Sequence, residues 1–272
     1  MPTTDKPAGR LIMASNGLGL PQDIPTRSLD AVRSADLLVF EEDRGGRPVL
    51  KAAGIHRSYL RFNEHNQQET LNEIRAALRQ GRTVAYLSDQ GCPGLADPGR
   101  AVVAVAVQEK AHVTSIPGPS SITSAIAVCP FDLSRFQFAG FPARDGEERL
   151  VQLRSLARSG EPVILLDTPY RMLQLLAACR DVWGPAHKAT LALDISGPEE
   201  KNITASLQTL IEVAADCGKL NFVLIIDRGT AKSAPHPTPA APAQKPAPTA
   251  NGAKARSRVK PPRSRRRQPG RP

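Results

Sequence analysis

The chain has 272 residues, of which 40% are hydrophobic and only 4% aromatic, so a buried core must rest on Leu, Val, Ile and Ala. Its net charge of +10 is unevenly distributed. Residues 231–272 hold 11 Lys or Arg and no acidic residue, whereas the other residues hold 25 basic and 26 acidic ones. The longest apolar run, Ala101–Val107, is too short for a membrane span of roughly 20 residues, and no signal-peptide pattern opens the sequence. These features exclude a membrane-spanning protein and predict a cytoplasmic one.

The cysteines also limit the class of protein. Cys92, Cys129, Cys179 and Cys217 are widely separated and form no CxxC pair. This spacing disfavours a zinc site or a disulfide framework and is typical of a reducing cytosol. We therefore expect no metal site.

Short apolar runs alternate with helical periodicity along most of the chain. Strands are expected at Leu11–Ala14, Leu37–Glu41, Ser58–Phe62, Thr83–Leu87, Val113–Ile116, Phe136–Ala139, Val163–Leu166, Thr190–Asp194 and Phe222–Ile226. The clearest helix is Asn66–Gln80, which Gly81 ends. Others are expected to begin at Asp97-Pro98, a capping carboxylate followed by proline, and after Pro169. The alternation predicts an α/β fold with mainly parallel strand pairing.

A turn-rich segment, Pro117–Ser121, divides this pattern into two parts. We expect an N-terminal α/β domain over residues 10–118 and a C-terminal α/β domain over residues 119–230. Residues 231–272, the basic arm, combine Pro, Ala, Lys and Arg with almost no large apolar residue. Such a segment cannot bury enough surface to offset the entropy of ordering it, so we expect it to be disordered.

The segment Ser88–Gly99 is the most informative candidate for a binding loop. It follows an expected buried strand and leads into a helix, where open α/β sheets usually hold ligands. Its glycines allow positive φ and close approach of a ligand, and Asp89 can accept hydrogen bonds. We interpret Asp97 as a helix cap and Asp89–Cys92 as the binding part. A purely structural loop is the alternative.

Two further glycine-containing loops follow expected strands. Pro117–Ser121 offers amides and hydroxyls at a helix start, which can hold a polar ligand group or simply cap the helix. Gly17–Pro21, with Glu41–Asp43 at the end of the second strand, is similar to a dinucleotide-binding pattern. That interpretation ranks lower, because the third glycine is missing and Leu20-Pro21 occupies the expected helix start.

Together, these segments resemble the tetrapyrrole-methylase superfamily of S-adenosylmethionine-dependent methyltransferases. The matching segments occur in the same order over residues 10–229: Gly17–Leu20, Glu41–Arg44 with Arg47, Glu64–Asn66, Ser88–Gly99, Pro117–Ser121, Gly140–Pro142 and Asp167–Arg171. Within the superfamily, the chain is most similar to the ribosomal RNA small subunit methyltransferase I branch, which methylates the ribose 2′-hydroxyl of a cytidine.

The resemblance implies two α/β domains, a homodimer, and S-adenosylmethionine bound in the cleft between the domains. It also implies which residues line the cofactor site: Leu20, Asp89, Gly91, Cys92, Ser120, Ser121 and Leu166.

The chain departs from the family pattern at several positions. Cys92 replaces a threonine, and Asp43–Gly46 replaces a Thr-Arg-His-Thr segment. Ala192–Gly197 lacks an arginine and a lysine of the pattern, and Tyr170 replaces a histidine. The cofactor loops therefore match better than the groups expected to face the substrate, and the chain resembles a divergent member.

Methyl transfer to a hydroxyl requires an in-line approach and a group that removes the proton. Glu64 and His65 are our candidates for this base, although Glu64-His65-Asn66 could simply begin the following helix. Glu41 and Glu42, at a strand end, are a second option.

Three hypotheses for the acceptor remain open. The leading one is RNA, contacted by Arg44 and Arg47 and attracted by the basic arm, which carries no aromatic residue for base stacking. The second is a small molecule such as a tetrapyrrole. The third is a non-catalytic RNA- or ribosome-binding relative. Arg44 and Arg47 could equally lie on a solvated surface.

Overall fold

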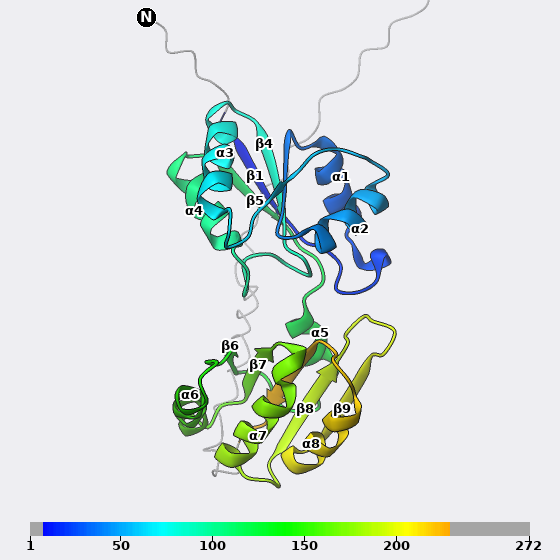
Figure 1. The fold of residues 1–272 in the computed structure, drawn as a ribbon, viewed down its shortest axis with the longest axis vertical. Helices are drawn as coiled ribbons and strands as arrows, with labels where there is room; N and C mark the ends of the chain where they lie inside the picture. Colours follow the sequence, from blue (N-terminus) through cyan, green and yellow to red (C-terminus); the bar gives the residue numbers. More distant parts are fainter. Residues whose placement is uncertain (1–7, 229–272) are drawn as a thin grey trace, which may run out of the picture. The chain divides into compact units, whose positions relative to one another are not determined.

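The computed structural model describes residues 8–228, which form strands, helices and two sheets within one compact unit (Figure 1). The basic arm, which we expect to be disordered, lies outside the described residues.

The first sheet has the strand order β3-β2-β4-β1-β5, and every pairing in it is parallel. Its strands are β1 (Arg10–Ala14), β2 (Leu37–Phe40), β3 (Leu60–Arg61), β4 (Thr83–Leu87) and β5 (His112–Ile116). Its helices are α1 (Thr26–Ser34), α2 (Asp43–Ala53), α3 (Gln67–Arg79) and α4 (Gly99–Gln108), with a short 3₁₀ turn, η1 (Pro21–Asp23), before α1.

Helices cover both faces of this sheet, which explains why its central strands, β2, β4 and β1, are almost continuously apolar. Along β1, Ile12 and Ala14 pack with α1 and α2, whereas Leu11 and Met13 pack with α3 and α4 (Figure 1). Successive side chains of a strand point to opposite faces, so a sheet buried on both sides needs a continuous apolar run.

The second sheet has the order β6-β7-β10-β8-β9. Its strands are β6 (Gln137–Gly140), β7 (Val163–Asp167), β8 (Lys188–Leu193), β9 (Lys201–Ser206) and β10 (Phe222–Ile226). Its helices are α5 (Ser121–Ala127), α6 (Gly146–Arg158), α7 (Met172–Trp183) and α8 (Leu207–Asp216), with a 3₁₀ turn, η2 (Pro169–Arg171), before α7. Residues of α6, α7 and α8 pack on one face and residues of α5 on the other.

The expected α/β class is confirmed, and each expected strand occurs within two residues of its predicted bounds. The expectation of mainly parallel pairing holds for the first sheet and is wrong for the second. There only β6 and β7 pair in parallel, and the pairs β7–β10, β10–β8 and β8–β9 are antiparallel. Strand β9 was not expected, because Lys201–Ser206 is a polar, partly exposed edge strand without a continuous apolar run.

Local signals set several helix boundaries. The expected helix Asn66–Gln80 is α3, and Asp97 Oδ1 accepts a hydrogen bond from the amide of Gly99 at 2.7 Å, where α4 begins.

The four cysteines are free thiols. Within residues 8–228, no helix combines the length and the apolar character that a membrane crossing requires.

Candidate functional site

Three loops meet at one edge of the first sheet, because parallel strands end on the same side. They are residues 15–20 after β1, residues 88–98 after β4 and residues 117–120 after β5. Backbone bonds join the first two loops: the amide of Asn16 donates to Gly91 O at 2.9 Å, and the amide of Gly91 donates to Gly17 O at 3.1 Å. The third loop is joined through Cys92, whose thiol donates to Gly118 O at 3.3 Å.

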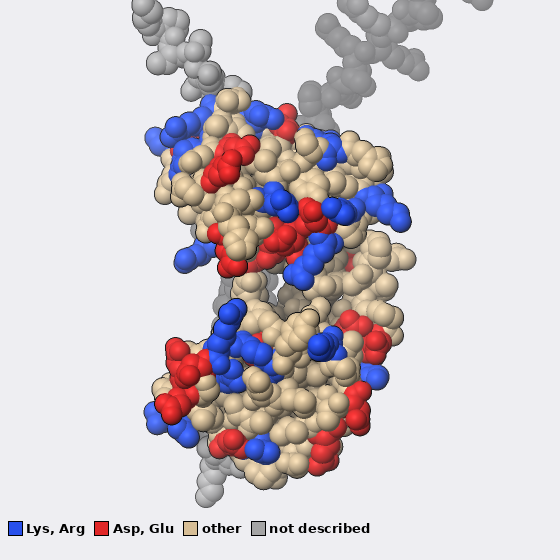
Figure 2. All heavy atoms as spheres, viewed as in Figure 1, with Lys and Arg blue, Asp and Glu red and all other residues tan. Residues whose placement is uncertain are grey.

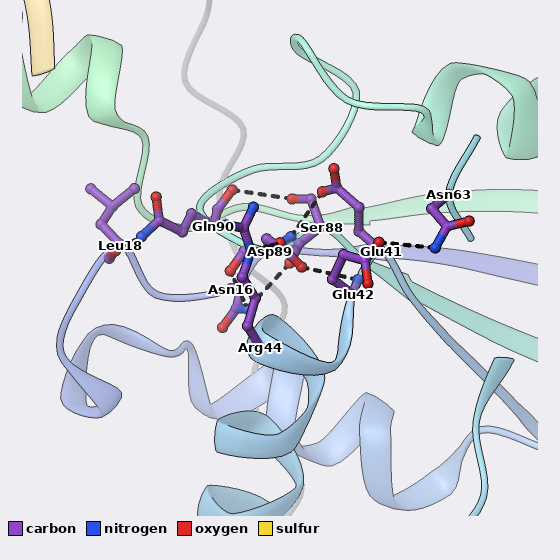
Figure 3. A network of polar contacts seen from close by, with 9 residues as sticks. All are labelled: Asn16, Leu18, Glu41, Glu42, Arg44, Asn63, Ser88, Asp89 and Gln90. Atoms are coloured by element: carbon purple, nitrogen blue, oxygen red, sulfur yellow. Dashed lines mark hydrogen bonds and ion pairs between the residues drawn. The ribbon is translucent and has the colours of Figure 1, made fainter. Parts of the chain in front are cut away.

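Asn16 holds the first two loops together from inside (Figure 3). Its side chain is buried, and Nδ2 donates to Ser88 O at 3.2 Å and to Asp89 O at 2.9 Å. Its Oδ1 accepts from the amide of Gly17 at 2.8 Å. A buried amide with every polar atom engaged stabilises one arrangement of the loops. Sequence analysis gave Asn16 no role, since its partners at 88 and 89 lie far along the chain.

Gly91 is required where these loops touch. Its φ of +68° is unfavourable for a residue with a side chain. A Cβ atom at this position would also lie 3.2 Å from both Leu18 Cδ2 and Pro119 O. The glycine therefore permits the close approach of the loops, and its expected contact with a ligand stays a prediction.

Asp89 is the centre of a polar network between β4 and the start of α2 (Figure 3). Its Oδ1 accepts from the amide of Glu42 at 3.0 Å, and its Oδ2 accepts from Nε of Arg44. This contact raises the pKa of the Arg44 guanidinium. The Asp89 side chain is only 10% exposed, and its carboxylate already fixes the first turn of α2. A role in cofactor binding stays a prediction beside this structural role.

Glu41 directly follows β2, next to this network. Its Oε2 accepts from the amide of Asp89 at 3.1 Å. Burial, with repulsion from the Asp89 and Asp97 carboxylates, raises the pKa of Glu41 above its ordinary 4.5. Burial also raises the pKa of Asp97, against the hydrogen bonds from the amides of Gly99 and Gly94. Two carboxyl groups at this edge therefore hold protons more strongly than exposed ones do.

A cavity of about 420 Å³ opens beside these loops, within the range of roughly 300–1,000 Å³ common for small-molecule sites. The second sheet and its loops contribute Phe141, Leu166 and Asn221 to the lining. The lining combines apolar side chains, among them Leu18 and Leu95, with the carboxyl groups of Glu41, Asp89 and Asp97. The cavity can therefore hold a ligand that has an apolar part and a positively charged or hydroxyl-bearing part.

The structure brings together most of the residues predicted to bind the cofactor. The lining of this cavity includes Asp89, Gly91, Cys92, Ser120, Ser121 and Leu166. It also includes Arg44, which the sequence predicted to contact the substrate. Leu20 lines a smaller neighbouring cavity of about 130 Å³ that shares Arg44 and Asp89 with the larger one. Asn221 had no signal in the sequence. Leu18 and Leu95 lie in the matching segments Gly17–Leu20 and Ser88–Gly99 but were not singled out there. Phe141 lies in the segment Gly140–Pro142, which the family pattern had already indicated.

The predicted base residues lie elsewhere. The side chains of Glu64 and His65 are 87% and 84% exposed, and neither lines the cavities described here. Asn63 Oδ1 accepts from the amide of His65 at 3.1 Å, and Asn66 Oδ1 accepts from the amide of Asn63 at 3.0 Å. These bonds form the turn before α3, which is the alternative that we considered for this segment.

Arg47 is also separate from the cavity. Its guanidinium pairs with Asp43 at 3.0 Å and is 75% exposed, one turn further along α2 than Arg44. On the face shown in Figure 2, basic and acidic side chains are interspersed rather than gathered into one patch. Between residues 8 and 228, no three His, Cys, Asp or Glu side chains lie close enough to hold a metal ion.

This chain is similar to known proteins in both sequence and fold. The model of the family described as Tetrapyrrole (Corrin/Porphyrin) Methylases matches residues 10–211. A protein of Thermotoga maritima named ribosomal RNA small subunit methyltransferase I is 35% identical over 176 residues, which are 65% of this chain and 79% of that protein. A protein of the same name from Mesorhizobium japonicum is 31% identical over 226 residues, which are 82% of this chain and 76% of that protein.

A solved structure shows the same fold at low sequence identity. The uroporphyrin-III-C-methyltransferase of Thermus thermophilus superposes with a TM-score of 0.58 and 16% identity, covering 81% of this chain and 94% of that one.

Proposed function

Since the chain belongs to the tetrapyrrole methylase family and is an S-adenosylmethionine-dependent methyltransferase, we propose that it methylates a ribose 2′-hydroxyl of small-subunit ribosomal RNA. The similarity to the Thermotoga maritima and Mesorhizobium japonicum proteins, whose name states the RNA acceptor, carries this proposal. The likeness to uroporphyrin-III-C-methyltransferase supports only the fold, because the identity is 16%.

The large cavity fits the cofactor by its chemistry. S-adenosylmethionine supplies a methyl group on a positively charged sulfur. Glu41 and Asp97 bring negative charge to the cavity, which favours a cationic ligand over a neutral one. Leu18, Leu95 and Leu166 offer apolar surface for a planar ring. We place the cofactor here.

We further propose that Glu41 accepts the proton of the acceptor hydroxyl. It lines the cavity, and a raised pKa brings a carboxylate nearer to the value that suits a base at neutral pH. Its Oε2 is held by the Asp89 amide, and Oε1 makes no hydrogen bond to any residue between 8 and 228. We place proton acceptance at Oε1. Glu64 and His65 remain the alternative predicted from sequence, and their exposure does not favour it.

The basic arm would add affinity for RNA without contributing to chemistry. Its Lys and Arg side chains release counterions from phosphate when they bind nucleic acid. The described residues are nearly neutral, so the surplus of positive charge lies in this segment. The homodimer implied by the resemblance also stays a prediction, which sedimentation of the full chain would test.

The direct test uses a strain from which the gene has been deleted. We expect mass spectrometry of its small-subunit ribosomal RNA to show the loss of one ribose-methylated nucleoside, and the purified full chain to restore it in vitro. Unchanged ribose methylation in the deletion strain would contradict the RNA proposal. Methyl transfer to a uroporphyrinogen instead would establish the small-molecule alternative.

A further inference from the structure

Three loops leave the second sheet at one edge. Strand β6 runs parallel to β7, with Gly140 beside Leu165, and β10 pairs with β7 so that Phe222 lies opposite Asp167. The chain after β6, the chain after β7 and the chain before β10 therefore emerge on the same side of the sheet (Figure 1).

Each of these loops carries a residue suited to nucleic acid. Phe141 follows β6, Tyr170 lies in η2 after β7, and Lys219 precedes β10. Phe141 is 50% exposed and Tyr170 is 74% exposed. Lys219 Nζ lies 4.6 Å from the centroid of the Tyr170 ring, within the range of a cation–π contact. The edge thus presents two aromatic rings and a cation to solvent. Exposing the apolar rings to water costs free energy that burial would avoid.

The same edge is continuous with the cofactor cavity. Phe141 lines that cavity and also a neighbouring one of about 160 Å³, which Leu166, Asp167 and Asn221 line as well. Tyr170 lies three residues beyond Asp167, and Lys219 lies two residues before Asn221. An acceptor that contacts Tyr170 and Lys219 is therefore already close to the cavity.

A buried ion pair fixes two of the loops. Arg171 donates through Nε to Asp167 Oδ1 at 2.7 Å, and its Nη2 lies 3.4 Å from Pro142 O. The Asp167 side chain is fully buried and that of Arg171 is 18% exposed. Arg171 thus connects η2 with the segment that carries Phe141, so the two rings are presented by loops held in a constant relation.

We propose that Phe141 and Tyr170 stack on bases of a single-stranded segment of the acceptor RNA, while Lys219 pairs with its phosphate. This inference rests on the proposed RNA acceptor. Every base has a flat face that stacks on an aromatic ring, and bases are free to do so in single strands and loops. The basic arm has no aromatic residue, so it cannot supply this contact. We name Phe141, Tyr170 and Lys219 the stacking platform.

The test measures binding of a fluorescein-labelled single-stranded RNA oligonucleotide to the full chain by anisotropy. Salt of roughly 0.5 M suppresses the contribution of the basic arm and leaves stacking. We expect Phe141→Ala and Tyr170→Ala each to raise the dissociation constant by about 5- to 100-fold, the usual range for loss of one stacked base. Tyr170→Phe keeps the ring and should bind as the wild type does.

Phe136 provides a matched control. It precedes β6 at the opposite end of the strand from Phe141 and is 40% exposed. Phe136→Ala removes the same kind of side chain at the other end of β6, and we expect unchanged RNA binding. Calorimetry with S-adenosylmethionine checks the cofactor cavity, since a Tyr170→Ala variant should keep the wild-type affinity for it.

An oligonucleotide with abasic sites separates stacking from other effects. If Phe141 and Tyr170 stack on bases, alanine variants and wild type should bind the abasic strand equally. Wild-type affinity of both alanine variants for the intact strand would overturn the proposal, as would equal losses with intact and abasic strands. The proposal would also be overturned if the two alanine variants bound uroporphyrin more weakly than the wild type and bound RNA equally well. That result would make the platform a tetrapyrrole site. A wild type that binds RNA through these rings but methylates none would refute the proposed function and leave the platform established.

Discussion

The edges of the two sheets that line the cavity are built in different ways. At the edge of the first sheet, the side chains of Asn16 and Asp89 join the loops after β1 and β4 and the start of α2 by hydrogen bonds. At the edge of the second sheet, Phe141 and Tyr170 are exposed. A dense polar network holds one geometry, which suits a cofactor of constant structure. Exposed rings on loops that the Arg171–Asp167 ion pair connects are accessible to a large polymer. The comparison supports our proposal that the first edge is a preformed cofactor side and the second an accessible acceptor side.

The largest expected effect follows from replacing the proposed base. Glu41→Gln should lower kcat by about 10²- to 10⁴-fold, because it removes proton acceptance and keeps the shape of the side chain. Methyl transfer to small-subunit RNA at saturating cofactor measures it. Glu64→Gln is the matched control and should leave kcat unchanged. A loss confined to Glu64→Gln would instead place the base before α3.

The second prediction breaks the polar network. Asn16→Ala leaves Ser88 O and Asp89 O without their donor, and we expect a loss of about 3 kcal/mol in the free energy of unfolding. Urea unfolding measures the loss, and calorimetry should show weaker binding of S-adenosylmethionine. Asn202→Ala, at an exposed asparagine of β9, controls for the change of residue type. Equal stability of the two variants would contradict the importance of the network.

The third prediction concerns pH. The pKa of Glu41 is higher in the folded chain than its ordinary 4.5, so ionisation of this carboxyl costs the folded state free energy. Its stabilising contribution is complete below the ordinary value and is lost as the pH rises through the raised one. Glu41→Gln should therefore melt at a higher temperature than the wild type at neutral pH, and this advantage should vanish in acid. A wild type that melts higher at neutral pH would contradict the raised pKa.

The same shift predicts the acid limb of the activity profile. A base must be deprotonated to act, so kcat should rise with pH through the raised pKa of Glu41. A profile whose acid limb lies at the ordinary value of an exposed carboxyl would contradict the assignment.

The smallest effect on the folded residues is expected from removing residues 231–272. Loss of these 11 cations should flatten the dependence of RNA affinity on salt, by about 0.7 in the log–log slope for each lost contact with single-stranded RNA. The melting temperature should stay unchanged. An unaltered slope would show that the arm does not contact RNA.

The features that could be predicted from the sequence are those that depend on residues close together in the chain. Apolar runs such as Thr83–Leu87 predicted strands, and glycine loops at their ends predicted the binding segments. The antiparallel pairing of β8 and β10 was not predicted, because an apolar run carries no information on direction. Asn16 had no predicted role and Glu41 only a secondary one, because their hydrogen-bond partners lie more than 45 residues away in the sequence. Glu64 and His65 were chosen for their chemical type, and the fold places them in an exposed turn.

Tyr170 shows how the structure changes the meaning of a substitution. In the sequence it is a departure from the family pattern and suggests a lost contact with the substrate. In the fold it is an exposed ring beneath Lys219, at the edge that continues into the cofactor cavity. In the proposed stacking platform, the substitution supplies a stacking surface in place of the contact that the histidine would make.

The difference between the two edges is tested most directly by methyl-transfer kinetics of Asn16→Ala and Tyr170→Ala with both substrates varied. We predict that Asn16→Ala raises KM for S-adenosylmethionine and leaves KM for RNA unchanged, while Tyr170→Ala does the reverse. If each variant raises both constants equally, the two edges do not bind separate substrates.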